Sequence, residues 1–402
     1  MIVELRDAVV PTCGGKAGAL GALVRAGLPV PDGFAVPLDV HRAAARQGAD
    51  RSVPPRAGDD APESLPLPTG LVEALAGGLR ALGDVPVAVR SSAMGEDTAE
   101  ASAAGQHESV LAVSGVDDVV LAVRACWASL DSERAAAYRD AARGAPSAGM
   151  AVLVQRLVDA EVSGVMFTAA DPRGETRIEA SWGLGPSVVG GVVTPDAYRV
   201  AADGAVTRTL GDKRTRLDRV GGELVTSAVA HTRRHALDDS TLRALVALGR
   251  RIATLLGRPQ DVEWALAGGT LWVLQARPVT AAPPPPAAAV PTATGGVLTG
   301  TPGSAGTVTG PARVVRGATD FHRVRPGDVL VCPYTDPAWT PLLRIVAGVV
   351  TETGGVLSHA AIVARELRIP AVLGVTDATT RVDDGVHLTV DGAAGTVTPR
   401  VT

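Results

Sequence analysis

The stretch TETGGVLSHAAIVARELRIPAVLGV, residues 351–375, decides the fold of the C-terminal part of the chain. The apolar run 346–350 before it predicts a strand. Gly354 and Gly355 then predict a turn, and Ser358 stands where a helix N-cap is preferred. The order strand, glycine turn, capped helix is typical of an α/β unit.

His359 follows the predicted cap, so we expect it at the loop–helix junction, held out in the first turn of a helix over 360–368 that Pro370 ends. Unpaired amides and the positive end of the helix dipole would stabilise an anion there and favour a neutral, nucleophilic imidazole. The other interpretation is a solvated cap histidine. In the predicted helix, Ile362, Val363 and Leu367 are buried, while Arg365, Glu366 and Arg368 reach water.

The whole string resembles the phosphohistidine swivelling domain of phosphoenolpyruvate synthases, pyruvate phosphate dikinases, glucan water dikinases and rifamycin phosphotransferases. The shared pattern is T-x-x-G-G-x-x-S-H-A-A. The resemblance implies that His359 carries a phosphoryl group. It also implies that the histidine loop is shaped by Thr351, Gly354, Gly355 and Ser358.

A second motif, QDVEWALAGGTLWVLQARPVT at 260–280, predicts a β-hairpin around a Gly-Gly turn. The strand period of two places Asp261 and Glu263 on one face of the first strand, and Gln275 and Arg277 on one face of the second. This face suits one or two Mg²⁺ ions with phosphate oxygens. A solvated face with cross-strand salt bridges is the alternative.

D-x-E-W and L-Q-x-R-P resemble the ATP-grasp motifs of the same dikinase family. The resemblance implies that Glu263 and Gln275 coordinate Mg²⁺, or Mn²⁺, with Asp261 alongside. It further implies that Arg277 holds the phosphates of ATP together with Arg90 and Lys16.

Lys16 follows Gly14 and Gly15 and precedes a helical pattern that Gly27 ends. The segment is not a Walker A loop, because the spacing fails and Ala17 replaces the Ser or Thr that would bind magnesium. On spacing alone it is typical of a capped turn. The resemblance to the family's G-G-K-x-x-x-L-G segment implies that Lys16 contacts ATP phosphates.

Residues 87–111 predict a strand that ends at Arg90, followed by a loop of small and polar residues. Such a loop allows backbone amides to approach a triphosphate, and a flexible surface loop is the alternative. The family pattern V-R-S-S-A-x-x-E-D-x-x-x-A-S-x-A-G-Q-x-E is nearly intact and departs at Ala103. The residues predicted here to bind ATP are Arg90, Gly95 and Thr98.

Three further segments carry weaker predictions. Two strands over 150–168 resemble the wall of the family's adenine pocket, with Gln155 as a predicted ATP contact. The glycine-rich segment 183–198 is predicted to lie near the nucleotide, and 126–139 to be a packing helix. The T-x-P-x-W pattern at 335–339 resembles the loop that lies beside the family's histidine loop.

The composition excludes some classes of protein. The 402 residues carry a net charge of −4 with both signs mixed, which gives no reason to expect a nucleic-acid or anionic-membrane surface. Cys13, Cys126 and Cys332 lack metal-ligand spacing and fit reduced thiols in a cytoplasm. No signal peptide and no apolar run of about 18 residues is visible. The expected location is cytoplasmic.

The Pro/Ala-rich stretch 281–296 is the clearest boundary and predicts a semi-stiff spacer of roughly 3 Å per residue. The expected fold class is α/β (α+β). We expect an ATP-grasp nucleotide-binding domain at 1–280, a linker at 281–295 and a small swivelling α/β phosphohistidine domain at 296–402. A second Pro-rich stretch, 51–70, predicts a surface insertion.

The resemblance implies an ATP-dependent dikinase-type phosphotransferase. Mg·ATP would phosphorylate His359, giving AMP and phosphate, and the small domain would swing to a small-molecule acceptor. The barrel domain of phosphoenolpyruvate synthases and the drug-binding domain of rifamycin phosphotransferases do not fit between or after these two domains. The alternatives are a phosphocarrier that serves a separate acceptor-binding protein, an ATP-grasp ligase that makes an acyl phosphate and ADP, and an inactive binding module.

Overall fold

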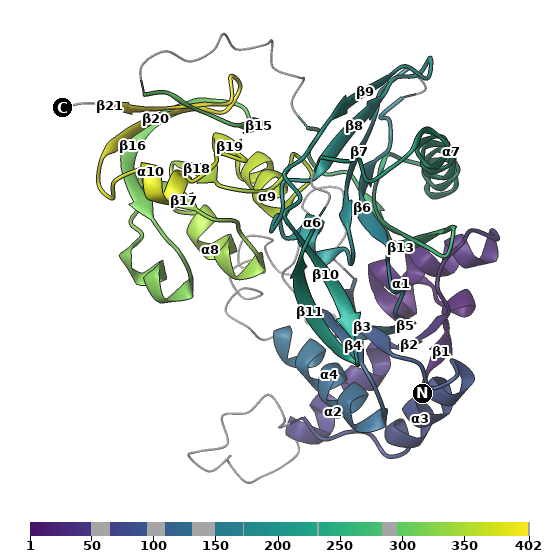
Figure 1. Cartoon of the computed structure of the whole chain (residues 1–402). Helices are drawn as coiled ribbons and strands as arrows, with labels where there is room; N and C mark the ends of the chain where they lie inside the picture. The colour runs from purple at the N-terminus through teal and green to yellow at the C-terminus, as the bar shows by residue number, and fades with distance from the viewer. Residues whose placement is uncertain are drawn as a thin grey trace. The chain divides into compact units, whose positions relative to one another are not determined.

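The computed structural model describes residues 1–49, 65–94, 109–130, 149–171, 173–230, 233–283 and 296–400. Contacts along the chain divide it into two units. Unit 1 comprises Met1–Asp159, Asp218–Val225 and Arg251–Pro278. Unit 2 comprises Ala160–Leu217, Thr226–Arg250 and Val279–Thr402. Figure 1 labels the elements along the chain.

Unit 1 is built on a five-stranded antiparallel sheet in the order β1-β2-β5-β3-β4. A β-hairpin, β12 with β13, completes the unit. Its elements are β1 (Val3–Glu4), η1 (Leu5–Asp7), α1 (Val10–Arg25), β2 (Gly33–Val36), α2 (Leu38–Ala49), α3 (Leu71–Ala81), β3 (Val87–Ala93), β4 (Ser109–Val113), α4 (Val116–Ser129), β5 (Met150–Arg156), β12 (Gln260–Ala267) and β13 (Thr270–Pro278).

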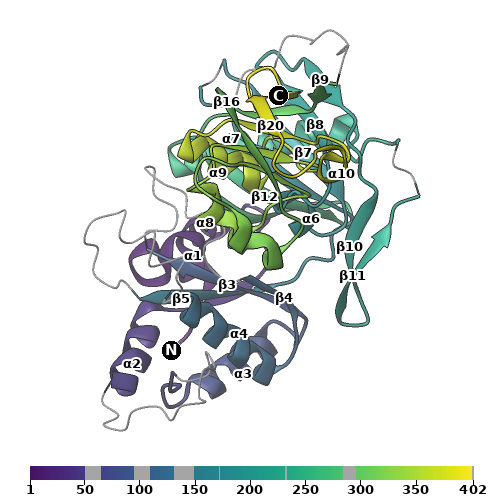
Figure 2. The ribbon, with the colours of Figure 1, turned by 90° about the vertical axis from the view of Figure 1, so that its left-hand side faces the viewer.

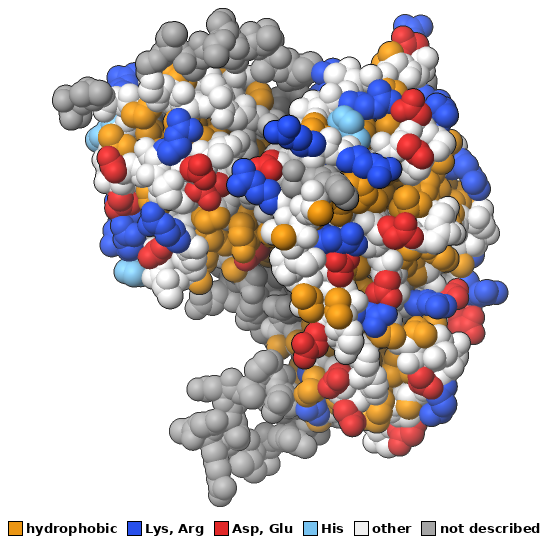
Figure 3. All heavy atoms as spheres, in the orientation of Figure 1, with side chains coloured by type: hydrophobic (Ala, Val, Ile, Leu, Met, Phe, Trp, Pro, Cys, Tyr) orange, Lys and Arg blue, Asp and Glu red, His pale blue; other side chains and the backbone are white. Residues whose placement is uncertain are grey.

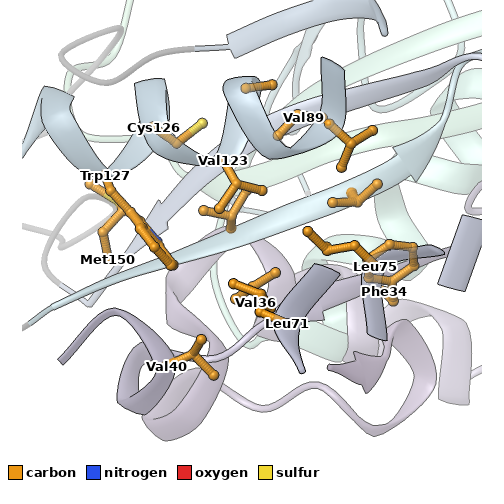
Figure 4. Close-up of a cluster of buried hydrophobic side chains, with 14 of the residues drawn as sticks. Phe34, Val36, Val40, Leu71, Leu75, Val89, Val123, Cys126, Trp127 and Met150 are labelled. Atoms are coloured by element: carbon orange, nitrogen blue, oxygen red, sulfur yellow. The ribbon is translucent and has the colours of Figure 1, made fainter. Parts of the chain in front are cut away.

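The core of unit 1 lies between one face of this sheet and the helices α2, α3 and α4, while α1 covers the other face (Figure 2). Alternate residues of the strands, such as Phe34 and Val36, point into this core because successive side chains of a strand face opposite sides. Trp127 of α4 is fully buried among them (Figure 4). Apolar burial on this scale fixes the strands that carry the candidate site.

The hairpin confirms the predicted turn. β12 and β13 pair antiparallel from Gln260↔Pro278 to Ala267↔Thr270, with one register shift between Glu263 and Trp264. Gly268 and Gly269 both have positive φ, 55° and 74°, as a tight two-residue hairpin turn requires.

Unit 2 contains an antiparallel run in which β6, β7, β8 and β9 pair consecutively. Three further elements, β10, β11 and α7, have residues in both units. The bounds of these elements are β6 (Val162–Phe167), β7 (Thr176–Trp182), α6 (Pro186–Val189), β8 (Asp196–Val200), β9 (Val206–Thr209), β10 (Thr215–Val220), β11 (Glu223–Ala228) and α7 (Asp239–Leu256).

The rest of unit 2 is an eight-stranded sheet in the order β14-β21-β20-β16-β17-β18-β19-β15. Its four central strands, β16 to β19, run parallel. The elements are β14 (Leu298–Thr299), β15 (Thr301–Ser304), β16 (Thr307–Val314), η3 (Ala318–Arg323), β17 (Val329–Cys332), η4 (Pro337–Trp339), α8 (Thr340–Leu343), β18 (Gly348–Thr351), α9 (His359–Leu367), β19 (Ala371–Leu373), α10 (Ala378–Arg381), β20 (His387–Asp391) and β21 (Thr396–Arg400). The mixed α/β architecture is the predicted class.

Two predicted boundaries are wrong. β3 continues past Arg90 to Ala93, because residues as far as Ala93 pair with β5. The helix predicted over 126–139 begins at Val116, directly after Gly115, and ends at Ser129. The remainder of that prediction, 131–139, lies outside the described residues, as do 51–64 of the Pro-rich stretch and 284–295 of the linker.

The two units do not coincide with the domains predicted from sequence, since unit 2 includes 160–217 and 226–250 as well as 279–402. The boundaries at 1–280, 281–295 and 296–402 therefore stay a prediction. All three cysteines are buried free thiols. In the part of the chain that the structure describes, no helix is long and apolar enough to span a membrane. On the face shown in Figure 3, acidic and basic side chains are interspersed.

Candidate active site

The face of the β12–β13 hairpin gathers the four predicted polar side chains. Asp261 lies opposite Arg277 and Glu263 lies opposite Gln275. Arg277 donates from Nε and Nη2 to Asp261 Oδ2, each at 2.8 Å. The side chains of Asp261 and Arg277 are only 6% and 11% exposed, so this charge pair is largely shielded from water. The predicted placement of all four residues on one face is confirmed.

Arg90 joins this face from β3. Its Nη1 donates to the carbonyl of Leu274 at 3.3 Å, and the same atom lies 3.6 Å from Glu263 Oε2. Arg90 therefore sits in the middle of a strand, beside the hairpin residues that the sequence predicted it would serve. A residue in the middle of a strand has paired backbone before and after it, so its guanidinium is positioned more rigidly than one at the end of a strand.

Lys16 reaches the same region through a break in α1. Gly14 has φ 76° and ψ 176°, which interrupts the helix, and a Cβ at this position would overlap the carbonyl oxygen of Ser92. Ser92 Oγ fixes the approach by donating to Cys13 O at 2.7 Å and accepting from the amide of Ala17 at 3.1 Å.

The ammonium of Lys16 then donates to Ser91 O at 3.2 Å, one residue from Arg90. Lys16 and Arg90 are thus held at neighbouring residues of β3, and Arg90 and Arg277 contact the two carboxylates of the hairpin face, all within unit 1.

Gln155 is also buried in unit 1, on β5, where its Nε2 donates to the carbonyl of Pro31 at 3.2 Å. Its role as an ATP contact stays a prediction. Gly95 and Thr98, predicted to contact ATP from the glycine-rich loop, lie outside the described residues.

The hairpin face offers the donors that Mg²⁺ prefers. Carboxylate and amide oxygens are hard ligands, and Mg²⁺ in nucleotide sites is usually held by one or two carboxylates plus substrate phosphates. Among the described residues, no group of three or more His, Cys, Asp and Glu side chains could hold a metal ion. Oxygen atoms of Glu263, Asp261 and Gln275 are donors of this kind, and their role as Mg²⁺ ligands stays a prediction.

His359 lies in unit 2 at the carboxyl ends of two parallel strands. β18 ends at Thr351 and leads through a seven-residue loop, 352–358, into α9, of which His359 is the first residue. The neighbouring strand β17 ends at Cys332 and leads into 333–339, which includes the T-x-P-x-W segment at 335–339. The carboxyl ends of parallel strands form one edge, which is where α/β sheets place their sites.

The two loops meet at the imidazole. Thr335 Oγ1 lies 2.9 Å from Nδ1 of His359, and Thr340 Oγ1 lies 3.3 Å from Nε2. The predicted proximity of the T-x-P-x-W segment to the histidine loop is therefore confirmed. The residue is only 5% exposed, so the expectation of a histidine held out at the junction is wrong, and so is the solvated cap.

Thr351, Gly354 and Ser358 each contribute to the shape of the histidine loop in a different way. Thr351 Oγ1 donates to Thr353 O at 2.6 Å, and Gly354 has φ 102°, which favours glycine. Ser358 occupies the N-cap position as predicted, but its hydroxyl donates to Gly355 O at 2.8 Å and makes no side-chain cap bond to the helix.

Arg365 was predicted to reach water, and this is wrong as well. It is half-buried, and its Nη1 donates to Val356 O at 2.8 Å and to Gly303 O at 3.0 Å. The guanidinium thereby connects α9 to its own entry loop and to β15.

Sequence reasoning missed Glu179. This side chain of β7 accepts hydrogen bonds from two consecutive amides of the histidine loop, those of Val356 at 2.6 Å and Leu357 at 3.1 Å. The motif IEASW gives no local signal for this, because the partners are more than 170 residues away. The segment 183–198 also reaches the loop, since Thr353 Oγ1 donates to Gly191 O at 2.6 Å.

The chain matches two protein-family models. Residues 10–294 match "Pyruvate phosphate dikinase, AMP/ATP-binding domain", and residues 324–395 match "PEP-utilising enzyme, mobile domain". The first match alone covers well over half of the chain. The chain belongs to the pyruvate phosphate dikinase family. The matches agree with the resemblance that the glycine-rich, hairpin and histidine motifs of this dikinase-family chain carry.

Curated relatives are named phosphoenolpyruvate synthases. The chain is 36% identical to a probable phosphoenolpyruvate synthase of Methanothermobacter thermautotrophicus, over 98% of this chain and 62% of the relative. It is 35% identical to the Aeropyrum pernix phosphoenolpyruvate synthase over 98% of this chain and 57% of the relative. For the Escherichia coli enzyme these values are 38%, 77% and 42%. The dikinase-family chain thus spans about two fifths to three fifths of the length of these relatives.

Proposed function

We propose that this chain is an ATP-dependent dikinase-type phosphotransferase in which His359 accepts a phosphoryl group and passes it to a small-molecule acceptor. The observation that carries the proposal is the setting of the imidazole. The hydroxyl of Thr335 lies 2.9 Å from Nδ1, and the hydroxyl of Thr340 lies 3.3 Å from Nε2. These two contacts orient the ring at the edge of the sheet, and an imidazole nitrogen is a nucleophile that can accept a phosphoryl group.

The cationic groups of unit 1 supply phosphate binding. Lys16, Arg90 and Arg277 neutralise the triphosphate, and their backbone and carboxylate partners hold each of them in place. Glu263, Gln275 and Asp261 would hold Mg²⁺, which when bound neutralises charge on the phosphates. Positioning and charge neutralisation are the main requirements of phosphoryl transfer.

The proposed reaction has two steps. An imidazole nitrogen of His359 attacks the β-phosphorus of ATP, the bond from that phosphorus to the α–β bridging oxygen breaks, and AMP leaves. The terminal phosphoryl group of the resulting pyrophosphoryl-histidine then passes to water or to phosphate. Phospho-His359 remains for transfer to the acceptor.

Pyruvate is the first acceptor to test. Phosphoenolpyruvate, the product in the relatives' names, is the enol phosphate of pyruvate. The chain spans only part of those relatives, so the acceptor site belongs either to this chain or to a separate acceptor-binding protein. In the second case the chain acts as a phosphocarrier.

The decisive experiment follows the label from ATP. Incubation with Mg²⁺ and ATP labelled at the β-phosphorus is expected to give AMP and a labelled protein, and His359→Ala is expected to abolish both. His387→Ala is the matched control, because His387 is an exposed histidine on β20 of the same unit. Release of ADP, or labelling that survives in His359→Ala, would refute the proposal and favour ligase or direct-kinase chemistry.

A second incubation separates enzyme from phosphocarrier. Loss of label from the protein on addition of pyruvate, with formation of phosphoenolpyruvate, supports transfer within this chain. A label that stays on His359 in the presence of pyruvate supports the phosphocarrier alternative.

A further inference from the structure

Glu179 is a buried carboxylate that holds the histidine loop from outside that loop. It lies on β7 and is only 2% exposed. Its two oxygens divide between two neighbouring amides, with Oε1 accepting from Val356 and Oε2 from Leu357. Glu179 and the loop both belong to unit 2. One side chain therefore occupies two consecutive amide donors of the segment that leads into His359.

The loop is shaped to admit this carboxylate. A Cβ at Gly355 would overlap both oxygens of Glu179, although the backbone of Gly355 is not in the left-handed region. Glycine at this position is thus explained by space for Glu179, whereas Gly354 is explained by its own φ of 102°. The two glycines of the motif have different physical reasons.

Gly191 also contacts the same loop in two ways. Thr353 donates to the carbonyl of Gly191, and a Cβ at Gly191 would lie 3.3 Å from Ser358 Cβ and 3.4 Å from Gly354 Cα. Neither of these two contacts involves a charged group. Glu179, by contrast, holds two amides of the loop with a carboxylate, and Arg365 binds the carbonyl of Val356 with a guanidinium.

We propose that Glu179 is a reversible clasp on the His359 loop, a positioning residue that holds the loop by its amides and opens when the loop has to move. The link between this clasp and phosphoryl transfer rests on the proposed function. The clasp itself does not, because it is a contact of the unphosphorylated chain.

The charge of Glu179 supports reversibility. Burial raises the pKa of this carboxyl to about 7, against the opposing effects of the Leu357 and Val356 amides, of Arg365 on α9 and of Arg177 on its own strand. Released into water, the carboxyl would return toward its ordinary value of 4.5. The clasped state therefore binds the proton more tightly than the released state.

The sign of the pH effect follows. Protonation favours the clasped state, so the clasp is strongest below about pH 4.5 and weakens as the pH rises through about 7. At neutral pH part of the population carries a buried charge on Glu179, so the clasp is weaker there than at pH 5. A phosphoryl group on His359, two residues after Leu357, adds negative charge and favours opening further.

Hydrogen exchange of the segment 352–358 tests the clasp directly. Corrected for intrinsic exchange, its protection in the wild type is expected to fall on the order of a hundredfold between pH 5 and pH 8, about one tenfold step for each unit of pKa shift. Glu179→Gln, which cannot ionise, is expected to remove this pH dependence. Glu179→Ala and Gly355→Ala, which break the contact from either side, are expected to lower protection at every pH.

Glu175→Gln is the matched control, because Glu175 directly precedes β7 and bonds Arg177 and Arg199 instead of the loop. It should keep the wild-type pH dependence. The clasp is refuted if wild-type protection does not change between pH 5 and pH 8, or if Glu179→Gln changes with pH as the wild type does.

The same measurement on phosphorylated protein tests the link to function. Lower protection of 352–358 in phospho-His359 protein at pH 8 supports release on phosphorylation, and equal protection refutes that link. If no phosphohistidine forms in the wild type, the proposed function fails, and the exchange data on unphosphorylated protein still decide the clasp.

Discussion

Arg277 directs both Nε and Nη2 at a single oxygen of Asp261, Oδ2, with both distances at 2.8 Å. The two residues stand opposite each other in the β12–β13 register, so the backbone pairing places the charges together. The hairpin thus holds Arg277, the proposed phosphate-binding cation, in one orientation.

Replacing Arg277 tests this pair. Arg277→Ala deprives the buried Asp261 of its guanidinium partner, so we expect the free energy of unfolding to fall by about 3 kcal/mol and labelling of His359 to be lost. The double variant Arg277→Ala, Asp261→Ala is expected to regain most of the stability without regaining the labelling. Urea denaturation and the label assay measure the two effects, and equal stability of the single and double variants would contradict the prediction.

Removing the hydroxyl of Thr335 tests the orientation of His359. Thr335→Val deletes the 2.9 Å partner of Nδ1, and we expect phospho-His359 to form roughly tenfold more slowly, the equivalent of one hydrogen bond. Thr335→Ser should restore the rate, and ATP affinity should not change because Thr335 belongs to unit 2. Wild-type labelling kinetics in the valine variant would show that this contact does not position the ring.

The ion pair of Lys213 with Asp196 tests the cost of an unpaired buried charge. Both side chains are 0% exposed, and Asp196 also accepts from the amides of Gly211 and Ala236. Lys213→Met is expected to lower the free energy of unfolding by about 3–5 kcal/mol, since it leaves a buried carboxylate without its cation.

The control for that variant is Arg214→Met, one residue along. Arg214 pairs with Asp212 on the surface, where the side chains are 72% and 51% exposed. We expect no resolvable change in the free energy of unfolding, because exposed ion pairs contribute little. Chemical denaturation of the two variants side by side checks the difference, and similar losses would contradict it.

Gly14 and Gly27 form a second matched comparison. Both have positive φ, 76° and 70°, but a Cβ at Gly14 would overlap Ser92 while nothing lies within 4 Å of one at Gly27. Gly27→Ala is expected to cost about 1–2 kcal/mol for backbone conformation alone. Gly14→Ala should cost clearly more and should weaken ATP binding, because the overlap displaces the turn that leads to Lys16. Calorimetry and nucleotide titration check both variants.

Part of this architecture was predictable from local sequence. The Gly268-Gly269 turn and the two-residue period of its strands fix the shared face of Asp261, Glu263, Gln275 and Arg277. The strand, turn and helix around His359 follow from similarly local signals, the glycine pair and the position of Ser358. In each case the determining residues are close together in the chain, so the backbone preferences act directly.

Other features depended on partners distant in the chain. The extension of β3 beyond Arg90 is set by pairing with β5. The burial of His359 depends on Thr335, in the loop after β17, and on Thr340, the first residue of α8. The inward turn of Arg365 depends on carbonyl groups of Val356 and Gly303. None of these partners is specified by the pattern around the residue itself.

The sequence by itself indicated the candidate site residues, through motifs and a family resemblance, and the local elements that hold several of them, because strand period and turn geometry act over a few residues. Only the tertiary structure decided what surrounds them. Glu179 is the clearest case, since a carboxylate on a strand becomes a partner of the Val356 and Leu357 amides only when folding buries it there. Burial then requires each polar group to find a partner, wherever in the chain that partner lies.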